Sequence, residues 1–414
     1  MKRNLLKQIR NEWRDNIWLV IELAVVGFSI WLLVFLLYSM TKNLYSPRGF
    51  DPDDVYSISV RTIGEDSPEF VSSSAGGDVN YYVDRSDLLR RLRENPNVEA
   101  VAVHSNGLPY NYNFMGNSLS RFDVDNDSVP YMGNLRKASP EMVRVLRLES
   151  RTGLTQQQLE DALRRGELLI SNDMAYSMES GDPVALKGER VVIGNDSSQV
   201  YKIADVIDCV RRSDYEPAFR GSIIYPLDED KRWTSGIALR VKPGRGKAFE
   251  EDFRTDKTLQ RQRNVYLTDL TSLSDIREGC QRSMDVKVRM FSVVVAFLIV
   301  TIFLGFLGTF WFRMQQRVSE IAIRKVSGAR KSWIFRRIVT EGLILLAVSM
   351  VIVSAVGWPV LMTDVINEMN EPWYVFLLLE CVVALIVAIG IVISLWYPAR
   401  KAMDIEPAIA IKAE

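Results

Sequence analysis

The sequence predicts an α-helical membrane domain of four transmembrane helices, with a large α+β extracytoplasmic domain inserted between helices 1 and 2. Four apolar runs are each long enough to cross a bilayer, which takes about 20 residues of helix: 17–38, 290–312, 341–362 and 373–397. Residues 39–289, between the first two runs, have the mixed composition of a soluble domain. The charges outside the runs alternate in sign along the chain, as they do in multi-pass membrane proteins.

The charge pattern also predicts the orientation. Residues 1–16 read as a basic amphipathic helix, and the 313–340 loop holds eight bases against the single acid Glu320 between Arg313 and Arg337. The 363–372 loop carries only acids, while the 398–414 tail is again basic at its start. Because short basic loops stay in the cytoplasm, we expect both termini and the 313–340 loop inside, and the large domain and the acidic loop outside.

Within residues 39–289, short alternating runs interleave with isolated amphipathic helices, which is typical of an α+β domain. We expect a strand at 55–63, a helix at 87–95 capped by Ser86, a strand at 98–104, loops and short hairpins over 105–134, and a helix at 154–165. Further strand candidates are 168–171, 189–193, 201–208, 221–225 and 236–241, followed by a helix near 246–253. Residues 277–289 are expected to form a helical stalk that continues into the second span.

Composition excludes several classes of function. With 51 basic and 51 acidic residues the net charge is zero, so no nucleic-acid partner is expected. His104 is the single histidine, which argues against histidine-based catalysis and His-rich metal sites. Three cysteines exclude a disulfide scaffold, and a Cys209–Cys280 pair is open but not expected.

The chain offers no nucleotide-binding motif. The nearest approach, around Gly246 and Lys247, has Val241 in place of the first glycine and Ala248 in place of the hydroxyl residue. Those glycines and that hydroxyl are what hold phosphate and magnesium. We therefore expect no catalytic, cofactor or metal site and no enzyme activity in this chain.

The basic loop is the most informative stretch. It is expected to form a helix over 320–337 with one apolar and one cationic face, interrupted at Gly328 where a helix could end. The apolar residues at helical spacing are Val318, Ile321, Ala322, Val326, Ala329 and Trp333. Physics alone leaves two interpretations open: an interfacial helix held by anionic lipid headgroups, or a docking element for a cytoplasmic partner.

The residue pattern of this loop resembles a known signature. Glu320-Ile321-Ala322-Ile323-Arg324-Lys325, followed by Ser327-Gly328-Ala329, is similar to the E-I-x-I-R-K-x-x-G-A segment of the MacB/FtsX-type permeases of ABC transporters, the mechanotransmission or type VII family. In that family the segment contacts the ATPase subunit. The resemblance therefore implies ATPase-coupling roles for Glu320, Ile321, Ile323, Arg324, Lys325, Gly328 and Ala329.

The resemblance extends to the C-terminal end, where residues 397–402 and 405–411 are similar to the family's closing P-A-R-x-A and D-P-x-x-A-L segments, with Glu406 in place of Asp. The first span departs from the family pattern because it is bulky and carries Glu22. The resemblance implies a half-permease in the bacterial inner membrane. Such a chain needs a second permease chain, identical or paralogous, and a separate ATPase dimer that binds ATP and Mg, and it leaves open a periplasmic adaptor or outer-membrane component.

Three acids fall within or beside the spans. Glu22 is expected to snorkel toward the cytoplasmic headgroups, with a functional carboxylate as the alternative. Glu380 is expected to face another helix or a water-filled gap, either as a functional group or as a packing contact. Glu341 lies at the cytoplasmic end of the third span, where it can pair with a base of the preceding loop.

These features predict the permease subunit of an ABC exporter or extractor, acting on an antimicrobial, a peptide or a lipoprotein outside the inner membrane. Two alternatives remain. One is an FtsX-like regulator in which the ATPase gates a cell-wall hydrolase. The other is a membrane-anchored receptor or sensor, which the coupling signature disfavours.

Overall fold

The computed structural model describes residues 13–72, 81–111, 115–122, 131–179, 182–194, 199–215, 221–227, 236–361 and 372–404. The chain divides into a membrane unit, residues 1–42 and 285–414, and an external unit, residues 43–284. Most of the N-terminal amphipathic helix, nearly all of the acidic 363–372 loop and the closing 405–411 segment lie outside the described residues.

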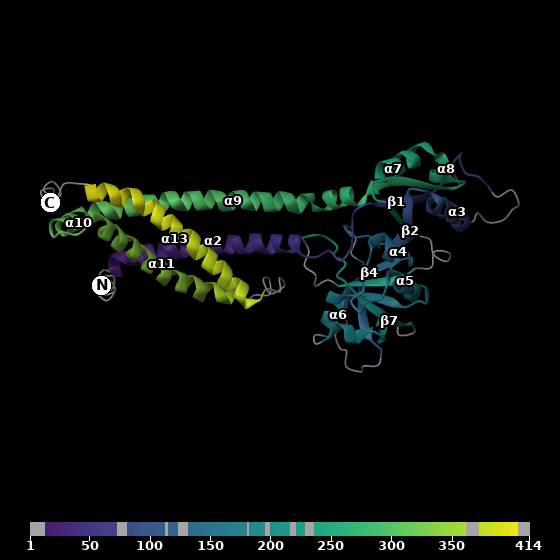
Figure 1. Ribbon diagram of the computed structural model, residues 1–414, viewed down its shortest axis with the longest axis horizontal. Helices are drawn as coiled ribbons and strands as arrows, with labels where there is room; N and C mark the ends of the chain where they lie inside the picture. The colour runs from purple at the N-terminus through teal and green to yellow at the C-terminus, as the bar shows by residue number, and fades with distance from the viewer. Residues whose placement is uncertain are drawn as a thin grey trace. The chain divides into compact units, whose positions relative to one another are not determined.

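The membrane unit is built from long apolar helices (Figure 1). The described helices are α2 (Trp13–Thr41), α9 (Leu273–Gln316), α10 (Val318–Val326), α11 (Lys331–Leu361) and α13 (Trp373–Asp404). Four of them, all except the short α10, are long and apolar enough to span a membrane. The expected spans 17–38, 290–312 and 373–397 each lie inside a longer helix, and the span 341–362 lies in α11 as far as Leu361, where this described range ends. Helix α9 supplies its first turns to the external unit.

Helices α2, α11 and α13 share a buried core, in which Trp31 stacks on Phe35 and meets Phe376 edge to face. Helix α9 adds Phe306 and Phe310 to this core, but most of its apolar span is exposed. In a bilayer such a surface faces lipid tails or another protein chain.

The external unit is rich in β-structure, as expected for the inserted domain. The described strands are β1 (Val55–Thr62), β2 (Val98–Ser105), β3 (Gly116–Arg121), β4 (Tyr131–Ala138), β5 (Leu168–Ser171), β6 (Arg190–Ile193), β7 (Val200–Ile207), β8 (Ser222–Pro226), β9 (Gly236–Val241), β10 (Arg261–Gln262) and β11 (Val265–Ser272). Their order is β10-β11-β1-β9-β2-β4-β3-β6-β7-β5-β8.

One additional pairing closes part of this sheet. Strand β8 also pairs in parallel with β4, from Asn134↔Ser222 to Ala138↔Pro226. The strands β4-β3-β6-β7-β5-β8 therefore form a closed ring, which leaves no free edge within that part. The ring encloses apolar residues from every strand of it and from helix α6 (Asn172–Met178).

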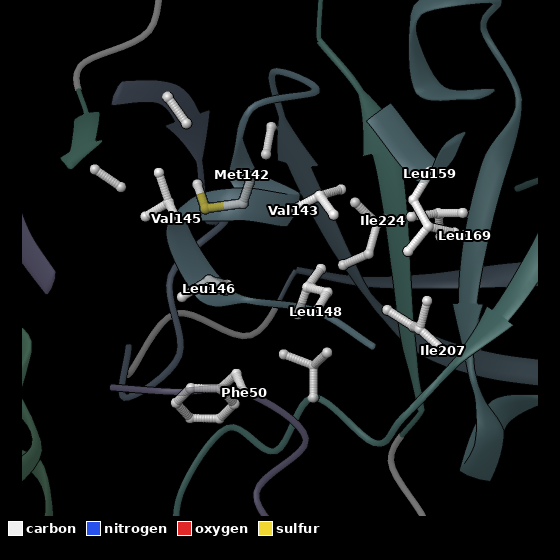
Figure 2. Close-up of a cluster of buried hydrophobic side chains, with 14 of the residues drawn as sticks. Phe50, Met142, Val143, Val145, Leu146, Leu148, Leu159, Leu169, Ile207 and Ile224 are labelled. Carbon is white, nitrogen blue, oxygen red and sulfur yellow. The ribbon is translucent and has the colours of Figure 1, made fainter. Parts of the chain in front are cut away.

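The remaining strands form an open sheet covered by helices α3 (Tyr81–Glu94), α7 (Gly246–Thr255) and α8 (Lys257–Gln260). A separate cluster joins the open sheet to the ring around α4 (Met142–Leu146) and α5 (Gln156–Arg164). In Figure 2, Phe50 lies beside Leu146 and Leu148, so the chain just after η1 (Lys42–Tyr45) is packed into this cluster.

Two sequence-based details of the external unit are corrected here. The helix expected at 87–95 begins at Tyr81, so Ser86 lies inside α3 and does not cap it. The helix starts earlier because Tyr81 packs on the open-sheet core together with Leu88, Leu89 and Leu92. The stalk helix likewise begins at Leu273, four residues before the expected start.

Candidate coupling site

The residues of the resemblance signature form a short helix and a tight turn between two membrane helices. Glu320, Ile321, Ile323, Arg324 and Lys325 lie on α10, and Gly328 and Ala329 follow it. The expected helix over 320–337 is two helices, and they divide at Gly328, where the sequence indicates an interruption. Helix α10 ends at Val326, and residues 331–340 belong to α11, which continues into the third span.

Gly328 is the physical reason for this break. Its φ of +88° lies in the left-handed region, where a residue with a Cβ is strained. The Gly328 N–H donates to the Lys325 carbonyl (3.1 Å) and the Ala329 N–H to the Arg324 carbonyl (3.0 Å). These two bonds make a Schellman motif, which satisfies the last carbonyls of α10 and turns the chain into α11.

Helix α10 rests on the membrane unit by one face only. Ile321 and Ala322 are buried, and Ile321 packs with Met314, Ile334 and Ala399 from the three neighbouring helices. Val326, at the end of the expected apolar face, is 67% exposed. Ile323 is 58% exposed, so α10 presents two large apolar side chains away from its own core.

A hollow of about 450 Å³ opens beside these residues. It is lined by Arg324, Ser327, Gly328, Ala329, Arg330 and Trp333. Arg324 also pairs with Glu320 one turn earlier on α10. The surface thus combines a concave, partly cationic floor with the exposed apolar side chains of α10.

The position of α10 is fixed by a bidentate ion pair. Arg317, the residue before α10, donates from Nη1 to both carboxylate oxygens of Glu341 on α11, each at 2.8 Å. The two side chains are 23% and 11% exposed. Glu341 therefore holds the start of α10 against the start of the third span.

The other two intramembrane acids contact different helices. Glu22 on α2 accepts a 3.4 Å hydrogen bond from the Thr309 hydroxyl on α9 and is half-buried. Glu380 on α13 is buried, and the Ser354 hydroxyl of α11 donates to it at 2.5 Å. The structure thus separates Glu22, Glu341 and Glu380 into three contacts between helix pairs and does not gather them into one site.

Within the described ranges, no three His, Cys, Asp or Glu side chains come together as a metal ion would require. The cysteines Cys209, Cys280 and Cys381 are all free thiols. The only histidine, His104, is buried in β2. Among the signature residues, the open surface that combines apolar and cationic side chains is that of α10 and its turn.

Comparison with known proteins places this turn in a family context. Residues 292–407, which include the end of α9 and all of α10 and α11, match the family described as FtsX-like permease C-terminal. This confirms the resemblance to FtsX-type permeases. The FtsX-like match covers the signature residues, the second span from residue 292 onward, and the third and fourth spans. No curated protein sequence matches the chain.

Three solved structures are similar to part of the chain. The periplasmic region of MacB from Actinobacillus actinomycetemcomitans is 13% identical, with a TM-score of 0.34, over 58% of this chain and 98% of that one. A domain of a putative permease from Porphyromonas gingivalis is 18% identical, with a TM-score of 0.31, over 54% and 94%. The extracellular domain of the noncanonic ABC-type transporter YknZ from Gram-positive bacteria is 12% identical, with a TM-score of 0.32, over 51% and 100%.

Proposed function

We propose that this FtsX-like permease is the membrane subunit of an ABC transporter, and that a separate ATPase dimer docks on α10 and its turn. The observation that carries the proposal is the division of α10 into two faces. Ile321 and Ala322 anchor the helix, while Ile323 and Val326 stay exposed and a hollow lined in part by Arg324 and Arg330 opens at the turn. A helix fixed on one face and apolar on the other suits insertion into a groove of a partner.

The chemistry of the surface defines the groove that would accept it. An apolar floor would cover Ile323 and Val326, and acidic side chains at the rim would meet Arg324, Lys325 and Arg330. Burying the exposed parts of the two apolar side chains is worth about 2–3 kcal/mol together. If the ATPase binds α10 with different affinity with and without ATP, the difference in binding free energy can drive a conformational change in the permease.

The proposal extends to partners and location. The exposed apolar face of α9, which includes Val293, Phe297 and Phe312, would face lipid and a second permease chain, identical or paralogous. Positive loop charge supports cytoplasmic termini in an inner membrane, with the external unit in the periplasm. There the transporter would export or extract an antimicrobial, a peptide or a lipoprotein by mechanotransmission, with or without an adaptor or outer-membrane component.

The test is co-purification of the permease, in lipid nanodiscs, with candidate ABC ATPase subunits from the same genome. Replacing both Ile323 and Val326 by serine removes exposed surface without touching the core. We expect the double variant to lose about 30- to 150-fold in affinity for the ATPase, which corresponds to 2–3 kcal/mol. Arg336→Glu, an exposed base outside α10 and its hollow, is the matched control and should bind normally.

Charge reversal of Arg324 and Lys325 is a less selective variant, because Arg324 already pairs with Glu320 and its reversal would disturb α10 itself. Wild-type ATPase affinity in the Ile323→Ser/Val326→Ser variant would refute docking at α10. The helix would then lie on lipid headgroups, and the receptor interpretation would gain support. Binding of a cell-wall hydrolase to the external unit, in place of substrate transport, would favour the FtsX-like regulator.

A further inference from the structure

A buried carboxylate joins the two chain segments through which the external unit continues into membrane helices. Asp214 lies in the stretch 208–215 between β7 and β8, which we call the connector, and its side chain is 2% exposed. One carboxylate oxygen accepts from the Tyr110 hydroxyl (2.8 Å) and faces Arg48 Nε (3.3 Å). The other binds Arg277 Nη2 (2.7 Å) and Nε (2.8 Å).

Arg48 and Arg277 lie in the two segments that link the external unit to membrane helices, which we call the first and second connections. Arg48 follows η1, the first element after helix α2, and Arg277 lies in the first turns of α9. Burial alone would raise the pKa of Asp214, but the neighbouring Gln281, Tyr110 and Arg277 side chains hold it below its usual value. The carboxylate is therefore ionised at neutral pH and binds both connections at once.

Arg211 of the same connector reinforces the first connection. It is buried and donates from Nη1 to the carbonyls of Asn43 (2.6 Å) and Ser46 (3.1 Å), and from Nη2 to the Asp214 carbonyl (2.6 Å). Asn43 returns a side-chain hydrogen bond to the Tyr215 carbonyl (3.1 Å). The backbone of the connector is thus tied directly to η1.

The opposite side of the connector is bound to the closure of the ring. The Val210 carbonyl accepts from Arg136 Nη2 on β4 (3.2 Å) and from the Ser222 hydroxyl on β8 (3.0 Å). Arg136 Nε also donates to the Ser222 hydroxyl (3.1 Å). These two strands are the pair whose contact closes the ring.

Apolar packing follows the same route. Phe50, from the first connection, and Leu273, from the start of α9, are buried in one cluster with the α4 residues of Figure 2. The Phe50 and Tyr110 rings meet edge to face at 5.7 Å. A displacement of either connection must therefore act on the connector through contacts that are both ionic and apolar.

We propose that the connector, through Asp214 and Arg211, carries displacement of the two membrane-linked segments to the β4–β8 closure of the ring. Asp214 is a positioning residue in this scheme, because it acts through Arg48 and Arg277 and touches no substrate. The inference rests on the proposed ATP-driven function. In the competing interpretation, these contacts only hold the domain together and transmit no displacement. Evidence of coupling separates the two interpretations.

The test is hydrogen–deuterium exchange on the full chain with its ATPase in lipid nanodiscs, with and without ATP and vanadate. In the wild type we expect nucleotide to change exchange in residues 273–284 and in the ring peptides 131–138 and 221–227. In Asp214→Asn we expect unchanged ATPase association and an unchanged response in 273–284. The response of the ring peptides should fall at least about fivefold, a loss that a purely structural role of Asp214 would not produce.

Glu94→Gln, which breaks an exposed ion pair with Arg90 on α3, is the control and should respond as wild type. If Asp214→Asn does not fold, Arg277→Lys keeps the charge but loses the two-pronged contact, and should give a partial loss. A wild-type ring response in the folded variant overturns the inference. Failure of the ATPase to associate with wild type overturns the proposed function and this inference with it, and is recognised by binding alone.

Discussion

The Arg317–Glu341 pair gives the sharpest test of how α10 is held. Arg317→Met removes the guanidinium and leaves the Glu341 carboxylate 11% exposed with its bidentate partner gone. Breaking one side of a buried ion pair costs about 3–5 kcal/mol. Because Arg317 is itself 23% exposed, water reaches part of the pair, and we expect a loss of about 2–3 kcal/mol.

The double variant Arg317→Met/Glu341→Leu removes both charges and should recover most of that loss, because no charge is left buried without a partner. For a unit of this size, 1 kcal/mol corresponds to about 2–4 °C in melting temperature. The single variant should therefore melt about 4–12 °C below wild type in detergent, and the double variant within about 4 °C of it. Arg336→Met, at an exposed base on the same helix, serves as the control.

Two results would refute this reasoning. One is a melting temperature for Arg317→Met that matches the Arg336→Met control. The other is a double variant that melts as low as the single variant, since the loss would then come from the arginine stem and not from the stranded carboxylate. The complete thermodynamic cycle distinguishes these cases, because its interaction energy isolates the charge pair.

Three further predictions concern other residues. His104 is buried, and burial lowers its pKa to about 4 from 6.5. As pH falls, the imidazole of the unfolded chain is protonated first, so stability should fall by about 1.4 kcal/mol per pH unit between pH 6.5 and 4. Urea titrations of His104→Gln should lack this slope. Gly49→Ala should lower the free energy of unfolding by at least about 3 kcal/mol, because its φ is +73° and the added Cβ would meet a carbonyl oxygen at 2.0 Å. Gly153→Ala, with φ +86° and open space around it, should lower it by only about 1–2 kcal/mol in the same urea assay. Ser354→Ala removes the hydrogen-bond donor to Glu380 and should lower stability by about 0.6 kcal/mol in detergent melts. An unchanged melting temperature would show that this contact does not stabilise the helix pair.

The membrane part of the fold could be predicted from sequence because its signals are local. A helix that crosses a bilayer needs a continuous apolar run, and loop charge reports the side of the membrane. Both are readable without knowing any contact. The sequence also indicates a break at Gly328, just after the end of α10. It does not show where α11 begins, because the helical spacing of apolar residues continues past the turn.

The connector could not be predicted in the same way. Arg211 and Asp214 stand in a stretch that reads as a polar, solvated loop, and nothing in its spacing indicates burial. Their partners, such as Asn43 and Arg277, are remote in the chain. Buried arginines that bind carbonyl groups leave no periodic pattern, because their partners are set by the topology and not by the local sequence. The β4–β8 closure is hidden for the same reason.

Helix α9 links these two kinds of information. It runs unbroken over 44 residues, about 66 Å at 1.5 Å per residue, from Leu273 to Gln316. Arg277 in its second turn binds Asp214, and Arg317, the residue after its end, binds Glu341. Each ion pair fixes one end of the helix to a different structural neighbour. If the proposed coupling operates, Arg317 and Asp214 act at opposite ends of this helix, and their variants are therefore separable tests of one mechanism.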